Sequence, residues 1–174
     1  VSLLFTFLGG LRALFVSFVF GWMSLSGSIV VRGLSWLVVE FFRGTSLVVQ
    51  LLWIFFVLPQ LGLRFEPMAA ATLAFGLNFG AYGAEVVRGA ITSVPKTQWE
   101  ATVALGLSRY RRMTRVILPQ ALPEMVPPFG NLWIQILKSS SLLYLIGITE
   151  LTFEVKQLQF DMGSMAAFSI ALVV

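Results

Sequence analysis

Cysteine and histidine are both absent from the 174 residues, and charged residues make up only 11% of them. Without cysteine there is no disulfide framework and no thiolate nucleophile. Without histidine, the commonest metal ligand and neutral-pH proton shuttle is missing. These absences argue against metal centres and catalytic triads. Apolar residues dominate instead: 57% of the chain is hydrophobic and its mean hydropathy is +0.88, which predicts a protein of the lipid bilayer.

The basic residues are concentrated in one part of the chain, which carries a net charge of +4. Six of the twelve lie in a single hydrophilic interval between apolar runs: Arg88, Lys96, Arg109, Arg111, Arg112 and Arg115. This distribution is typical of a cytoplasmic loop of a membrane protein. We therefore expect a lipid bilayer, and no nucleic acid, as the partner of the basic residues.

The remaining charges divide the chain into apolar runs. A helix needs roughly 20 residues to cross about 30 Å of hydrocarbon. The runs predict spans over residues 13–31, 47–63, 68–84 and 121–149, and the first part of a fifth over 162–174. Residues 32–46 mix charges with aromatic residues, which favours an amphipathic segment at the membrane interface. The fold class predicted is an all-α polytopic membrane protein of about five helices, forming one domain over residues 1–174.

Two further expectations concern continuity and orientation. Prolines 123, 127 and 128 predict that the fourth span is broken or kinked. The positive-inside rule places residues 32–46 and 86–119 inside, and residues 64–67 and 149–161 outside. Because the chain opens at Val1 and stops within an apolar run, we expect it to be a fragment.

The interval at residues 92–119 has an ordered pattern. Thr97 followed by Glu100 is a capping-box signature that predicts a helix ending at Gly106, and a second helix is expected to run to Pro119. A group of arginines can also serve only as an anchor on anionic headgroups. An anchor, however, requires neither a capped helix nor a glycine at a fixed place, so the pattern favours two short helices offered to the cytosol.

The spacing of Glu100-Ala101, Gly106 and Leu118-Pro119 resembles the EAA motif of permease subunits of binding-protein-dependent ABC importers. That motif runs E-A-A, three residues, G, nine residues, I, one residue, L-P. Thr102 and Val116 depart from it. Further stretches resemble the polar amino acid branch of histidine, glutamine and arginine permeases: "EFFRGTSLVVQL" (40–51), "NFGAYGAEVVRGAITSVPKTQWEA" (78–101), "ILPQALPEMVPPFGN" (117–131) and "LKSSSLLYLIGITEL" (137–151).

The resemblance implies a permease subunit of the bacterial plasma membrane that performs no chemistry itself. Residues 92–119 would be the cytoplasmic coupling loop, docking on a separate ABC ATPase subunit. The other partners implied are a second permease subunit, identical or paralogous, and an external solute-binding protein. The sequence has no G-x-x-x-x-G-K-[ST], so ATP and Mg would be bound by the partner subunit. The substrate implied is a polar amino acid or related zwitterion; "FRGTS", "AYGAEVVRGAI" and "VPPFGNL" are most similar to permeases for ectoine and hydroxyectoine.

Small and polar residues within the predicted spans give two expectations. Gly76, Gly80 and Ala84 recur every four residues, which predicts close helix packing. Polar groups at such depth are costly unless paired or facing a cavity, and the candidates for a substrate path are Asn78, Tyr82, Glu85, Asn131, Gln135 and Lys138. Glu85 and Lys138 either pair with each other or flank the path. Arg43 is expected to have a structural or gating role.

Two other classes of function remain as alternatives. An ion- or proton-coupled carrier or channel would use Glu85 or Lys138 without any ATPase. An intramembrane enzyme would depend on Lys138 with the serines at 139–141. The run "LKSSSL" coincides with "LKDTSL" of the permease family, which disfavours the enzyme.

Overall fold

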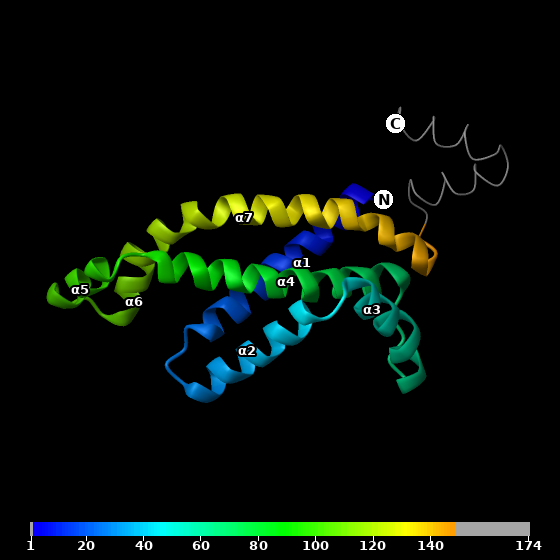
Figure 1. The fold of residues 1–174 in the computed structure, drawn as a ribbon, viewed down its shortest axis with the longest axis horizontal. Helices are drawn as coiled ribbons and strands as arrows, with labels where there is room; N and C mark the ends of the chain where they lie inside the picture. Colours follow the sequence, from blue (N-terminus) through cyan, green and yellow to red (C-terminus); the bar gives the residue numbers. More distant parts are fainter. Residues whose placement is uncertain (1, 149–174) are drawn as a thin grey trace, which may run out of the picture.

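The computed structural model describes residues 2–148, and within this part all secondary structure is helical (Figure 1). This confirms the predicted all-α class. The segment predicted outside at 149–161 and the fifth span predicted at 162–174 lie outside the described residues. The helices are α1 (Ser2–Ser24), α2 (Ile29–Gly44), α3 (Leu47–Leu52), α4 (Pro67–Ser93), α5 (Lys96–Ala104), α6 (Arg109–Arg112) and α7 (Leu118–Ser139). Two short segments are π-helical, at Trp53–Val57 and Met113–Ile117. Two others form 3-10 helices, at Leu58–Leu61 and Ser140–Ile146.

Helices α1 and α4 run in the same direction and pack closely, because glycines on each helix face side chains of the other. A Cβ atom built on Gly80 would lie 2.5 Å from Val16 Cγ1, and one on Gly76 would lie 2.9 Å from Arg12 Cβ. Further along, Gly21 of α1 meets Val87 of α4 in the same way. The stripe of small residues therefore packs two helices closely, as predicted, because only glycine lets their backbones approach to this distance.

Helix α7 runs antiparallel to both α1 and α4 and completes a three-helix layer (Figure 1). Its Trp133 covers Gly10 of α1. Ile136 joins a buried cluster with Phe5 and Phe75, whose rings meet edge to face at 4.8 Å. A second buried cluster lies near residues 94–117 and consists of Met125, Val87, Ile91 and Ile117. The described core thus lies along α4, which both neighbours cover.

The first predicted span, residues 13–31, is wrong in its boundaries. The helix runs over Ser2–Ser24, and the chain turns at 25–28 before α2 begins at Ile29. Arg12 does not end the span, because its guanidinium donates a hydrogen bond of 2.5 Å to Thr72 Oγ1 of α4. A charge satisfied by a neighbouring helix does not mark a membrane boundary.

Residues 32–46 were predicted to lie at the interface, and the structure places most of them in helix α2 (Ile29–Gly44), packed against α4. Helix α2 packs along α4 in the opposite direction, with Val39 buried against Ala81 and Ala84. Gly44 ends α2, and the chain continues into α3 and its following turns at an angle of 100°. Together Ile29–Gly44 and Leu47–Leu61 are long and apolar enough for one bent crossing. The second span predicted at residues 47–63 corresponds to the second arm of this bent pair, which is either a broken span or a re-entrant loop.

The remaining helices are longer or more regular than the sequence predicted. Helix α4 has 27 residues and extends to Ser93, a length of about 40 Å at 1.5 Å per residue. Helix α7 continues through Pro123, Pro127 and Pro128 without a break. In the described part, only Leu3–Ser24 is long and apolar enough to cross a membrane alone. Helices α4 and α7 are long enough, but their glycines, prolines and polar residues lower their mean hydropathy.

Candidate functional site

The elbow between α2 and α3 leaves backbone carbonyls without helical partners, and side chains satisfy them. Gln50 Nε2 donates to Phe42 O at 2.9 Å and to Thr45 Oγ1 at 2.5 Å. Asn78 Nδ2 of α4 donates to the same Phe42 carbonyl at 3.0 Å. Tyr82, one turn further, donates through its hydroxyl to the carbonyl of Arg43 at 3.3 Å. Asn78 is buried, so the structure places this predicted path residue as a cap of the elbow.

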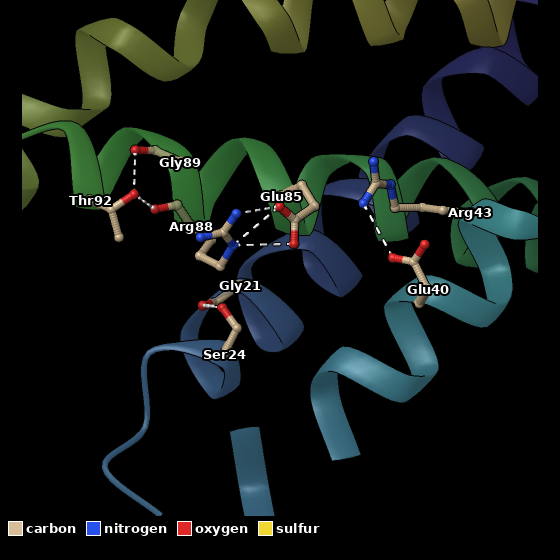
Figure 2. Close-up of polar contacts among 8 residues, drawn as sticks. All are labelled: Gly21, Ser24, Glu40, Arg43, Glu85, Arg88, Gly89 and Thr92. Atoms are coloured by element: carbon tan, nitrogen blue, oxygen red, sulfur yellow. Dashed lines mark hydrogen bonds and ion pairs between the residues drawn. The ribbon is translucent and has the colours of Figure 1, made fainter. Parts of the chain in front are cut away.

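Beside the elbow, α2 and α4 present charged side chains on one open face (Figure 2). Glu85 and Arg88 form an ion pair of 2.7 Å on α4, while Glu40 and Arg43 approach to 3.7 Å on α2. The Arg43 guanidinium lies 5.5 Å from the centre of the Tyr82 ring, a cation–π distance. These side chains are only partly exposed and alternate in sign across the face.

Arg43 is the incompletely satisfied member of this group. Its Nε is buried and has no hydrogen-bond partner among residues 2–148. A buried donor without a partner costs free energy, and charged groups at this depth are rare unless they pair or face a cavity. Because this Nε is not accessible, a further anionic partner could reach Arg43 of α2 only through its terminal nitrogens.

The predicted path residues of α7 do not contact Glu85. Asn131, Gln135 and Lys138 lie on the exposed side of α7. Phe129 approaches Gly83 of α4, and Lys138 lies about 13 Å further along α7 at 1.5 Å per residue. Of the two alternatives for Glu85 and Lys138, the structure does not form the pair in the described part of the chain, because Glu85 bonds to Arg88 one turn away on its own helix.

The predicted coupling loop contains a short helix whose C-terminal end matches the sequence. Helix α5 stops at Ala104, and Gly106 adopts a left-handed φ of +65°. Gly106 N donates to Val103 O and Leu107 N to Thr102 O, at 2.9 and 3.1 Å, the paired bonds of a Schellman motif. Glu100 and Ala101 are exposed on this helix. The predicted capping box is not formed, since the helix begins at Lys96 and no side chain caps it.

The second predicted helix does not end at Pro119. Helix α6, the π-helical turn Met113–Ile117 and α7 follow one another without a gap. Leu118 and Pro119 form the first positions of α7, where a proline is tolerated because its missing N–H is less needed. Ser108 caps α6 by accepting a hydrogen bond from Arg111 N. The loop is therefore continuous with the long helix behind it.

Buried contacts fix the base of the loop, while its tip is apolar and exposed. Trp99 and Met113 pack on the cluster that contains Ile91 and Ile117, and Ser93 at the end of α4 donates to a carboxylate oxygen of Glu124 on α7. At the tip, Leu105 and Tyr110 are 75% and 77% exposed. Tyr110, Met113 and Ile117 follow one another at helical spacing, but only the last two are covered.

Sequence reasoning missed the residues that hold this arrangement together. Gln50 and Glu124 were not singled out, and Arg88 was counted only as a loop charge. The i, i+3 spacing of Glu85 and Arg88 on one helix is a recognisable signal for an ion pair. No comparable local signal links Gln50 to the elbow, since its acceptors depend on a bend that the sequence did not predict.

The matching family defines the class of this protein. The chain belongs to the family described as binding-protein-dependent transport system inner membrane component, whose model matches residues 6–174. The family places the chain in the plasma membrane, among transport components and not among enzymes.

Relatives with more specific names share most of the chain. It is 49% identical over 164 residues to the probable amino-acid ABC transporter permease protein y4tF of Sinorhizobium fredii, covering 90% of this chain and 69% of that protein. It is 40% identical to the glutamine transport system permease protein GlnP of Escherichia coli, covering 87% and 70%. The crystal structure of an amino acid ABC transporter with histidines matches with a TM-score of 0.85 at 30% identity, covering 99% of this chain and 85% of that one.

Proposed function

We propose that this chain is the permease subunit of an ABC importer that moves a polar amino acid or a related zwitterion into the cytoplasm by ATP-driven alternating access. The observation that carries the proposal is the charged face between α2 and α4, where Glu85 and Arg88 of α4 and Arg43 of α2 bring both signs of charge together. Such charges mark solute pathways in membrane proteins. The relatives that act on amino acids support the substrate class.

A zwitterion matches this face because it carries both charges. Glu85 would accept from an ammonium group, and Arg43, whose side chain is 35% exposed, would donate to a carboxylate through its terminal nitrogens. Gln135 and Lys138, exposed on α7, would line the same path nearer the outer end. Ectoine, a zwitterion without a long side chain, is one candidate substrate.

The loop at 92–119 would transmit the motion of the ATPase. Its tip offers exposed Val103, Leu105 and Tyr110, an apolar surface that suits insertion into a cleft of another protein. Its base is fixed to α4 and α7 by buried contacts, so a displacement of the tip would reach both helices. The partners required are a cytoplasmic ATPase subunit that holds ATP and Mg, a second permease subunit, and an external solute-binding protein.

The test is uptake of labelled glutamine into proteoliposomes that contain the complete permease, its ATPase and its binding protein. We expect uptake to require ATP inside and to persist when an ionophore removes the membrane potential. Uptake that continues without ATP and stops with the ionophore would favour a secondary carrier instead. Competition by unlabelled ectoine, arginine, histidine and glutamate then ranks the substrates.

The role of the charged face is tested in the same assay by Glu85→Gln. Losing a hydrogen bond to a charged group costs about 1.5–3 kcal/mol, so uptake should fall about tenfold or more. Glu66→Gln is the matched control, because Glu66 lies exposed in the turn before α4 and its neutralisation should leave uptake unchanged. Equal uptake by the two variants would remove Glu85 from the path.

A further inference from the structure

A half-open pocket of about 470 Å³ lies between the end of α1, the first turns of α2 and the last turns of α4. We propose that it binds an anionic phospholipid of the cytoplasmic leaflet, with the phosphate held by Arg32 and Arg88 and an acyl chain along the apolar wall. Figure 2 shows the polar side of this region, with Ser24 at the end of α1 and Arg88 and Thr92 on α4.

The charge at the rim favours an anion. Arg32 lines the pocket. Its guanidinium group has no hydrogen-bonded or ion-paired partner in the described part of the chain. Arg88 uses its Nε and one terminal nitrogen on Glu85, which leaves the other terminal nitrogen free. Two guanidinium groups therefore face one carboxylate, and the surplus positive charge is available to a phosphate.

The walls are suited to hydrocarbon and not to a small polar solute. Phe20, Leu25, Ile29 and Val39 line the pocket together with the ring of Trp36, and Trp36 is 62% exposed. Tryptophan is enriched where membranes meet water, since its ring is largely apolar with one polar edge. An amphiphile covers both the charged and the apolar part of this pocket.

The depth of the pocket identifies the leaflet. Thr92 lines it and lies in the last turn of α4, next to the segment 94–117. If that segment is the cytoplasmic coupling loop, as the proposed function states, the pocket opens at the cytoplasmic surface. Basic pockets between transmembrane helices on this side bind anionic headgroups.

The experiment uses the complete permease–ATPase complex, exchanged into mixtures of phosphatidylglycerol and phosphatidylcholine and analysed by native mass spectrometry for retained lipid. Arg32→Gln should weaken the preference for phosphatidylglycerol about fivefold, since one basic residue near a membrane surface is worth about 1 kcal/mol. Arg64→Gln is the control, because it removes an equal charge from the exposed turn that precedes α4 and should leave the preference unchanged.

A second variant separates the pocket from the rim charge. Gly33 lines the pocket and a Cβ there would meet no atom within 4 Å, so Gly33→Phe should fill the space while both arginines remain. We expect Gly33→Phe also to reduce the phosphatidylglycerol retained. Unchanged retention of phosphatidylglycerol in either variant would overturn the proposal. The proposal would also be overturned if Arg32→Gln separated the two permease subunits while the amount of retained lipid stayed the same, because the pocket would then belong to a subunit interface. These readouts do not depend on transport, so they stand apart from the uptake test.

Discussion

Ser46 begins α3 directly after the elbow, at a position where a proline fits the backbone. Its φ is −68°, within the range that a proline ring enforces. Thr45 before it is extended, with φ −105° and ψ 147°, as a residue preceding proline prefers. The Ser46 N–H has no hydrogen-bond acceptor in the described part of the chain, so a proline there would sacrifice no bond.

We therefore predict that Ser46→Pro stabilises the protein by about 0.4–1 kcal/mol through the entropy of the unfolded chain. The measurement is the thermal unfolding midpoint of the purified complex in detergent. Ser28→Pro is the matched control: Ser28 also precedes a helix with φ −79°, but its N–H donates to Ser26 Oγ at 3.3 Å. A lower midpoint for Ser46→Pro than for Ser28→Pro would contradict the expectation.

Individual residues also show where sequence reasoning works and where it does not. The left-handed Gly106 and the close approach at Gly76 and Gly80 follow from local rules, because only glycine suits those positions. The role of Arg12 could not be predicted, since its partner Thr72 lies on another helix. Asn78 and Tyr82 were singled out correctly as unusual, but their acceptors belong to an elbow that only the three-dimensional structure reveals.

At the scale of elements, two helices end in Schellman motifs of the same geometry, one in the loop at 92–119 and one outside it. The motif outside the loop serves as a control for a test of the proposed coupling role. Gly106 after α5 has φ +65° and Gly147 after the last 3-10 turn has φ +76°. At Gly147 the bonds repeat the pattern, from Gly147 N to Tyr144 O and from Ile148 N to Leu143 O. The two glycines therefore have similar backbone requirements at opposite ends of the described bundle.

We predict that Gly106→Ala and Gly147→Ala each destabilise the protein by about 1–2 kcal/mol, the cost of a left-handed residue with a Cβ. Only Gly106→Ala should also lower substrate-stimulated ATP hydrolysis by the complete complex. The stability is measured by thermal unfolding and the coupling by phosphate release with and without loaded binding protein. Equal stimulation in the two variants would mean that the loop does not couple.

The helices themselves were only partly predictable from charges and prolines. Span boundaries placed at Arg12 and Arg32 shifted the first helix, because the true end is a turn at 25–28. Pro123 and Pro127 lie on the exposed side of α7, where the carbonyls that lose their donors are not enclosed by other helices. Helix α7 stays continuous through all three prolines, although a proline in a helix interior removes a hydrogen bond and usually kinks or breaks the helix.

The whole molecule has two exposed sides of different character. One is the side of α7 that carries Gln135 and Lys138. Another is the apolar side of α1, where Phe15 is 72% exposed. If the protein transports a polar solute, the first side should meet water and the second should meet lipid.

This difference is measurable because the 174 residues contain no cysteine. We predict that Gln135→Cys in the assembled transporter reacts with a water-soluble maleimide, while Phe15→Cys does not react until detergent is added. The rates are compared by mass spectrometry of intact subunits. Similar rates in membranes would contradict a water-lined path on α7.

The close crossing of α1 and α4 has a mechanical consequence. Gly80 lies at the midpoint of α4, about 20 Å from either end at 1.5 Å per residue. Because close contacts with α1 extend on both sides of Gly80, from Gly76 to Val87, α4 and α1 would tilt together as one body. A tilt about a central point moves the two ends by equal distances in opposite directions. A push at the cytoplasmic end of α4 would thus displace its outer end the other way, so that narrowing on one side of the membrane accompanies widening on the other.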